Sequence, residues 1–205
     1  MKKIKFAIML ISLLIVGCAS NPMDVTTESK VQEAAPNEAQ IVFMRDSLLG
    51  AAISSSLFDI TNPNNDPVFV GILNNNTKVI YKTEPGPHLF MVIGESADFM
   101  SANIIKGKTY YSLVTPRMGI WKARFSLWPI KPNVDADYSY SDKKNFNQWN
   151  NTHIALITDK ALSWYNNNKD NIIEKRNDYI TDWNEYSADS KAKRTLDKND
   201  YYQDL

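Results

Sequence analysis

The sequence predicts a mostly β protein: an antiparallel β-sandwich, or a small barrel, of about seven to eight strands with a C-terminal α-helical extension. Three observations indicate this class. Between residues 40 and 128 the chain repeats short runs that are rich in β-branched and aromatic residues. Turn-forming residues separate these runs roughly every ten residues, and no helical segment lies between them, which argues against a βαβ array. After residue 158 apolar residues recur at the spacings of an amphipathic helix.

The first 17 residues have the features of a signal peptide. Lysines within the first five residues form a basic beginning, and residues 4–16 form an apolar stretch. This stretch is shorter than the roughly 20 residues that a membrane-spanning helix needs. It leads through Gly17 into Cys18, the only cysteine of the chain, and this junction resembles a bacterial lipobox. The resemblance implies that residues 1–17 are removed and that Cys18 becomes a lipidated N-terminus, an anchor in the membrane.

The residues after Cys18 bear on localisation. An aspartate at that place is associated with retention in the inner membrane of Gram-negative bacteria, whereas this chain has Ala19 and Ser20. The resemblance therefore implies a lipid-anchored protein of the bacterial outer membrane, on its periplasmic or its surface face. Without residues 1–17 the chain has 20 basic and 23 acidic side chains. This balance gives no basic footprint for nucleic acid, so we expect no nucleic-acid partner.

Residues 18–39 are predicted to be the lipidated cysteine and a flexible tether. The segment is rich in Ser, Thr, Asn, Glu and Ala and lacks periodic apolar residues, so it has little surface to bury. A flexible chain of this length spans on the order of 25 Å. We expect the tether to hold the folded part away from the lipid headgroups.

Residues 40–130 are predicted to form the β domain. The runs expected to be strands are residues 40–45, 55–60, 67–73, 78–82, 88–94, 98–104, 109–115 and 121–128. Alternation is clearest in the last run, where Ala123, Phe125 and Leu127 share one face with Trp121, while Lys122, Arg124 and Ser126 share the other. We expect the face of Phe125 to be buried and the other face to be solvated.

Residues 131–205 are predicted to be a linker and a C-terminal helical extension. Thr158 and Asp159 suit a helix N-terminus. One face of the following helix is expected to carry Ala161, Leu162, Tyr165, Ile172, Tyr179, Trp183 and Tyr186. Such an aromatic stripe is more often a packing face than a ligand site, so we expect it to pack on the sandwich. The charged residues that end the chain are expected to fray.

Several strand-and-turn signatures resemble a known family. They are "IVFMR", "FVGIL" with its Asn-rich turn, "EPGPHLFMV" and "KTYYSLVTPR", within residues 40–130. They are similar to a widespread bacterial family of small secreted lipoproteins with a β-rich domain of unknown function. The resemblance implies a β-sandwich-like fold and assigns no catalytic residue.

Few residues suggest catalysis. The two histidines, His88 and His153, are too few for a zinc site unless folding brings carboxylates to them, so no metal site and no cofactor are expected. A Ser-His-Asp arrangement stays open because geometry defines it, but no G-x-S-x-G, phosphate-loop or H-E-x-x-H motif occurs. Glu95 and Asp98 are near enough in sequence to form an acid/base pair, although a polar turn is the simpler interpretation.

Two classes of function remain. The first is a non-enzymatic interaction or structural module of the envelope, held to the membrane at Cys18 and contacting an unknown envelope protein or cell-wall partner. Its candidate partner contact is Arg117 with Met118, which we expect at the tip of a tight hairpin between Pro116 and Gly119. The alternative is a protein that binds a glycan or peptidoglycan, with or without hydrolysing it, and stacks sugars on exposed aromatic rings. Aromatic residues buried between sheet and helix would favour the first class.

Overall fold

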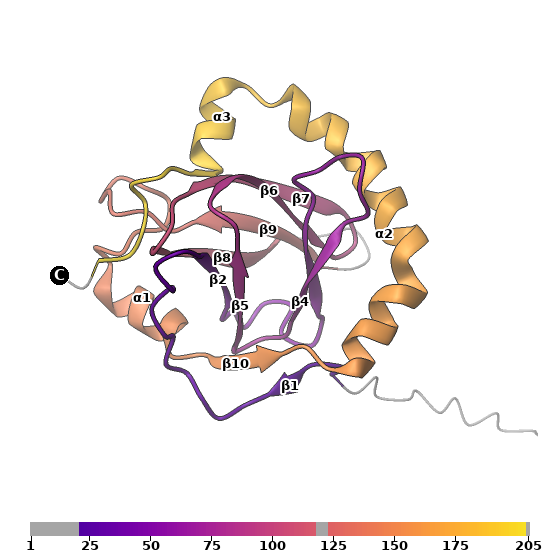
Figure 1. Ribbon diagram of the computed structural model, residues 1–205, viewed down its shortest axis with the longest axis horizontal. Helices are drawn as coiled ribbons and strands as arrows, with labels where there is room; N and C mark the ends of the chain where they lie inside the picture. Colours follow the sequence, from indigo (N-terminus) through magenta and orange to yellow (C-terminus); the bar gives the residue numbers. More distant parts are fainter. Residues whose placement is uncertain (1–20, 118–122, 204–205) are drawn as a thin grey trace, which may run out of the picture.

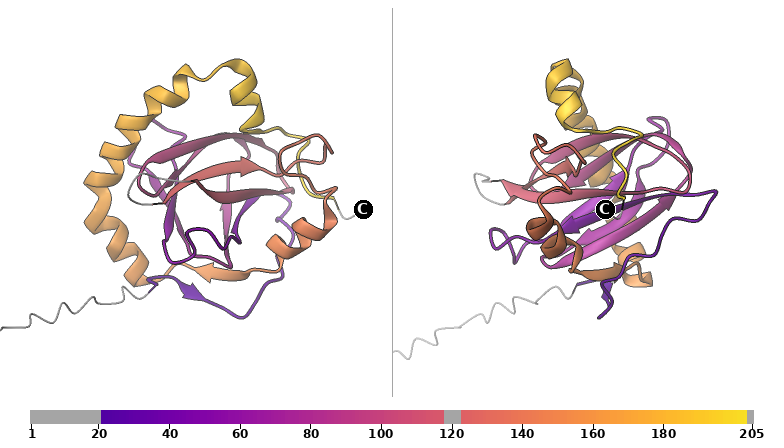
Figure 2. Two further views of the ribbon diagram at one scale, coloured as in Figure 1. Left: turned by 180° about the vertical axis from the view of Figure 1, so that it is seen from behind. Right: turned by 90° about the vertical axis from the view of Figure 1, so that its left-hand side faces the viewer.

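The computed structural model describes residues 21–117 and 123–203, and these form two β-sheets that share one core (Figure 1). The order of strands is β1-β10-β5-β2-β8-β9 in the first sheet and β11-β7-β6-β3-β4 in the second. The strands are β1 (Asp24–Val25), β2 (Ala39–Arg45), β3 (Ser55–Asp59), β4 (Val68–Leu73), β5 (Thr77–Thr83), β6 (Gly86–Ile93), β7 (Ala97–Ile104), β8 (Thr109–Arg117), β9 (Arg124–Pro129), β10 (His153–Leu156) and β11 (Thr195–Leu196). The helices are α1 (Lys143–Asn150), α2 (Asp159–Glu185) and α3 (Ala188–Lys193). Figure 2 shows α1 and α2 at opposite edges of the sheets.

The mostly β class is confirmed, whereas the purely antiparallel arrangement is wrong and the sheets do not close into a barrel. Three strand pairs are parallel: β2 with β8, β10 with β5, and β11 with β7. In the pair of β2 with β8, one edge of β2 is already paired antiparallel with β5. The chain then passes through the second sheet, and β8 pairs with the free edge of β2 in the parallel direction. The other two involve short strands from the C-terminal part of the chain.

The eight predicted runs correspond to β2 through β9, with small differences at their ends. The sequence did not predict β1, β10 and β11, which have two to four residues each. Runs this short contain too few side chains to show a period of two.

The main core lies between the sheets. Phe43 of β2 and Phe90 of β6 meet edge to face with ring centroids 5.1 Å apart. Phe125 and Leu127 are fully buried, as predicted for that face of β9. The opposite face of β9 is less exposed to solvent than expected, because Ser126 is also buried.

Helix α2 covers the second sheet (Figure 1). The Thr158 hydroxyl accepts a hydrogen bond from Ala161 N at 3.2 Å and caps the helix as predicted. Tyr165 stacks on Phe69 of β4 with ring centroids 5.4 Å apart. Ala161, Ile172 and Trp183 are buried and Tyr179 packs against the core, which confirms the packing face, but Leu162 and Tyr186 are exposed.

Both ends of the described chain pack on the domain. The segment expected to be a free tether contains β1, where Val25 pairs with Ala155, and it inserts Met23 into the core beside Gly71. At the other end, where fraying was expected, Leu196 of β11 is fully buried. A few buried side chains and backbone pairs fix these segments although their composition is polar. The C-terminal part therefore contributes strands to both sheets, beyond a linker and a helix.

Candidate functional site

A polar cleft of about 1050 Å³ lies between residues 29–34, the exposed side of α1 and the beginning of β8. Its lining combines side-chain amides with charged groups: the amides are Gln32, Asn76, Asn147, Gln148, Asn150 and Asn151, and the charged residues are Lys30, Glu33, Asp46, Lys108 and Lys144. An amide offers both hydrogen-bond donors and acceptors, and so do the hydroxyl groups of a neutral polar ligand. With three lysines and two acids beside the amides, the cleft suits a polar ligand that both donates and accepts hydrogen bonds.

Helix α1 supplies one wall of the cleft. It begins at Lys143 after Asp142, whose side chain accepts a hydrogen bond from Asn145 N at 3.2 Å. Phe146 is buried in a second apolar cluster, and this fixes which side of the helix turns to solvent. Gln148 on the open side donates to Asp46 Oδ2 at 2.8 Å.

Lys78 of β5 joins the two sides of the cleft from beneath. Its ammonium donates to Ser29 O at 2.6 Å, to Asn150 Oδ1 at 3.2 Å and, in a short contact, to Asn150 O. The residue is fully buried, and burial lowers the pKa of Lys78 to about 8. An ammonium has three donors, so these three oxygens match it.

Two aromatic residues are part of the cleft lining. Tyr111 and Tyr202 line it, and their rings meet edge to face at 5.6 Å within the second apolar cluster. Trp183 lies between α2 and the second sheet, near Phe99, and Tyr165 is stacked there. Most of these rings serve packing, which favours the interaction module over a row of stacking platforms.

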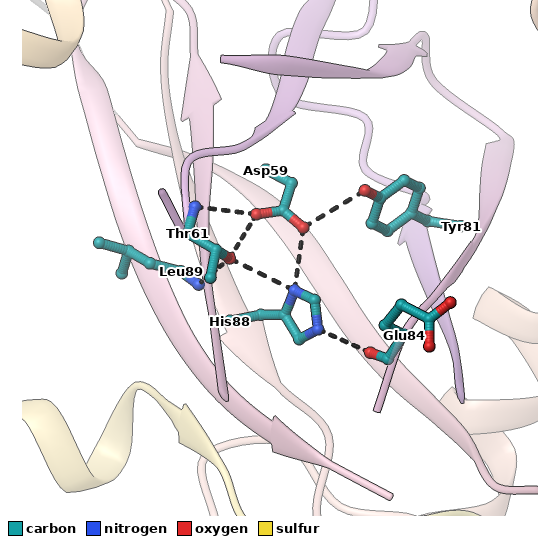
Figure 3. A network of polar contacts seen from close by, with 6 residues as sticks. All are labelled: Asp59, Thr61, Tyr81, Glu84, His88 and Leu89. Carbon is teal, nitrogen blue, oxygen red and sulfur yellow. Dashed lines mark hydrogen bonds and ion pairs between the residues drawn. The ribbon is translucent and has the colours of Figure 1, made fainter. Parts of the chain in front are cut away.

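The second candidate site is a network around His88 (Figure 3). His88 Nδ1 lies 2.9 Å from Asp59 Oδ2, and Nε2 lies 2.9 Å from Glu84 O. Thr61 donates its hydroxyl proton to Asp59 Oδ1 at 2.5 Å, and Tyr81 donates to Asp59 Oδ2 at 3.3 Å. The side chains of His88 and Asp59 are 9% and 7% exposed.

The partners of His88 determine its charge. Both ring nitrogens lie within hydrogen-bond distance of an oxygen, and the imidazolium form satisfies both contacts because it donates from both nitrogens. Burial alone would lower the pKa of His88, but the hydrogen bonds to Asp59 and Glu84 outweigh it and raise the pKa above its ordinary value. Burial alone would raise the pKa of Asp59, but hydrogen bonds from His88 and Thr61 lower it.

This network lacks the geometry of a hydrolytic triad. In a triad the hydroxyl and the carboxylate face different nitrogens of the histidine, whereas Thr61 and Asp59 both approach Nδ1 of His88. The Thr61 hydroxyl is also engaged by Leu89 N, which donates to it at 3.1 Å. The arrangement holds β3 and β6 together and leaves no ring nitrogen for a substrate.

The residues that the sequence singled out do not form one site. Cys18 and Met118 lie outside the described residues. Arg117 is exposed at the end of β8, opposite Arg124. Pro116 lies within β8 opposite Phe125, so this strand continues two residues beyond the predicted run, and the rest of the predicted turn lies outside the described residues.

The two acids of the predicted polar turn have separate partners. Glu95 pairs with Arg124 at 3.1 Å. Asp98 pairs in a short contact with Arg194 and accepts from Leu127 N at 3.0 Å. His153 lies away from them, on β10 opposite Thr77. The sequence did not predict the cleft. Its one signal for the cleft was the amide-rich run at residues 145–151, whose composition is that of a polar linker.

The residues that the structure describes contain no cluster of His, Cys, Asp and Glu that could hold a metal ion. Of the helices in that part of the chain, none has the length and apolar content to cross a membrane. No protein-family model, no curated protein and no solved structure matches this chain.

Proposed function

We propose that this protein is a lipid-anchored module of the bacterial outer membrane, attached at Cys18, and that its folded domain binds an envelope protein or a cell-wall component without catalysing a reaction. The resemblance to small secreted lipoproteins remains part of this proposal. The observation that carries the binding function is the amide-lined cleft of about 1050 Å³. A volume of this size suits a ligand group or a protruding segment of a partner.

The His88 network supports a non-enzymatic role. In this network His88 is paired with the carboxylate of Asp59. Its Nδ1 contacts Asp59 and its Nε2 contacts the backbone oxygen of Glu84. A general base needs a free lone pair within reach of a substrate proton. His88 has none, so it contributes to stability.

The anchor is tested by a Cys18→Ser variant. We expect it to remain uncleaved after Gly17 or to be released in soluble form, because serine cannot form the lipidated thioether. Membrane fractionation, with palmitate labelling and the mass of the N-terminal peptide, measures both outcomes. A variant that is still labelled with palmitate and fractionates like the wild type would contradict the anchor.

The glycan-binding alternative is favoured by one feature of the cleft. Amide groups suit the neighbouring hydroxyls of a sugar, and Tyr111 and Tyr202 add apolar surface. Sugar binding needs no catalytic residue.

A pair of double variants tests the cleft. Asn147→Ala with Gln148→Ala removes two exposed amides from it, and Asn166→Ala with Asn167→Ala removes two exposed amides from α2 as a control. Crosslinking in the intact envelope, followed by mass spectrometry, identifies a protein partner, and titration with soluble muropeptides tests the glycan. We expect the first variant alone to lose the partner or the ligand. Equal binding by both variants would contradict the cleft as the binding site. The exposed Arg117 would then be the next candidate.

A further inference from the structure

The connection between β2 and β3 exposes an apolar loop, residues 47–53. Leu48 is 96% exposed, Leu49 is 54% exposed and Ile53 is 40% exposed. Residues 47–56 contain no charged side chain. Single exposed apolar residues are common, but several in one uncharged loop indicate a contact surface.

The fold holds this loop in shape. Arg45 is fully buried, and its guanidinium donates to Gly50 O and to Ile53 O at 2.6 Å each. The positive φ of Gly50, 66°, allows the chain to turn above the guanidinium. The amide oxygen of Asn75 accepts from Ser47 N at 2.7 Å. These contacts fix the backbone of the loop, in which Leu48 and Leu49 are exposed.

The loop lies beside the place where the described chain begins. Asn21 and Pro22 line the same groove as Ala51 and Ala52. On its other side Pro22 O accepts from the Thr158 hydroxyl at 2.5 Å. Figure 1 shows the start of the described chain close to β1 and the first turn of α2.

The same neighbourhood has further exposed apolar residues. Ile157 and Leu162, on either side of Thr158, are both exposed. The beginning of the described chain is thus flanked by two apolar segments, one from the β2–β3 loop and one from the start of α2.

We propose that the apolar loop inserts its leucines into the lipid surface next to the anchor, as a second membrane contact that orients the domain. This inference rests on the proposed lipidation of Cys18. Two residues lie between Cys18 and Asn21, and the three steps from one to the other span no more than roughly 11 Å at about 3.3 to 3.6 Å per residue. An anchor at Cys18 therefore holds Asn21 and the adjoining loop at the headgroups, where apolar side chains insert about 5 to 10 Å deep.

The contact would also fix the direction of the cleft. Figure 1 shows α1, which forms one wall of the cleft, on the side of the molecule away from the start of the described chain. With two membrane contacts the domain cannot rotate freely about its anchor. The cleft then keeps one orientation toward its partner.

Photo-crosslinking tests the contact in the processed full chain. The protein is placed in vesicles of phosphatidylethanolamine and phosphatidylglycerol that contain a phospholipid with a diazirine near its glycerol backbone. Wild type is compared with Leu48→Ser, Leu49→Ser and with the control Val134→Ser, whose residue is 72% exposed in the connection between β9 and α1. Adducts are mapped by mass spectrometry, and the mass of the N-terminal peptide reports lipidation independently.

We expect phospholipid adducts on residues 47–53 in the wild type and in the control. In the double variant they should fall on the order of tenfold, because two leucines no longer partition into the bilayer. A lipidated Cys18 without adducts on the loop overturns the loop contact alone. A loop without phospholipid adducts, in a solubilised wild type that sediments as a dimer while Leu48→Ser, Leu49→Ser sediments as a monomer, overturns it in favour of self-association. An unmodified Cys18 overturns the anchor, and with it the basis of this contact.

Discussion

At the scale of single residues, the neighbours of His88 favour its charged form because their hydrogen bonds raise its pKa. The stability that it contributes is fully present below the ordinary histidine pKa of 6.5 and is lost as the pH rises through its raised folded pKa. Asp59 has a lowered pKa, so its contribution is present above the ordinary value of 3.8 and is lost as the pH falls through the folded pKa. Together the two residues stabilise the fold most between these two ordinary values.

A pH series of unfolding curves tests this pair. In the wild type, the free energy of unfolding should decrease as the pH rises from 6 through the folded pKa of His88, and His88→Gln should remove this decrease. The variant His153→Gln is the control, since His153 takes part in none of the ion pairs between described residues. A decrease that persists in His88→Gln would show that another group titrates.

Phe125 is a second residue with a defined energetic role. It is fully buried in β9, and the guanidinium of Arg45 lies 4.3 Å from the centroid of its ring. Phe125→Ala should lower the free energy of unfolding by about 3 to 5 kcal/mol, because it leaves a cavity and removes this cation–π contact. The exposed Leu162→Ala is the control and should change it by less than about 0.5 kcal/mol. Denaturant unfolding measures both, and equal values would place Phe125 outside the core.

At the scale of elements, Lys78 joins β5 to the segment at Ser29 and to the end of α1. Lys78→Met leaves the Ser29 and Asn150 oxygens without their donor and should cost about 1 to 3 kcal/mol. Hydrogen exchange should increase in residues 29–34 and at the end of α1. Lys82→Met on the same strand is the control, because the Lys82 side chain is 59% exposed. Unchanged exchange in Lys78→Met would show that other contacts hold the cleft closed at its base.

At the scale of the whole molecule, the C-terminal residues complete the second sheet. Leu196 of β11 is fully buried beside β7, and Arg194 pairs with Asp98 of that strand. Leu196→Ala should lower the free energy of unfolding by about 2 to 5 kcal/mol, while the whole domain still unfolds in one transition. Near-ultraviolet and far-ultraviolet circular dichroism should give the same midpoint, and the exposed Leu156→Ala serves as the control. Two separate midpoints would mean that the C-terminal part unfolds on its own.

The sequence by itself determined the elements that adjacent residues encode. The strands β2 through β9 follow from alternating apolar residues and from the turns between them. Thr158 and the recurring apolar residues after it define α2, because a cap and a helical face are local features. The inward side of Phe125 follows from the same local pattern.

Only the tertiary structure decided which elements meet. The parallel pairing of β2 with β8 joins residues that are far apart in sequence, and no local pattern specifies it. Lys78 and Arg45 are charged residues on strands, so their burial depends on carbonyl groups that distant segments and loops bring to them. The cleft also arises between such segments, since Lys78 and Asn150 are 72 residues apart. A side chain's partners in three dimensions, and therefore its charge and its role, depend on this long-range packing.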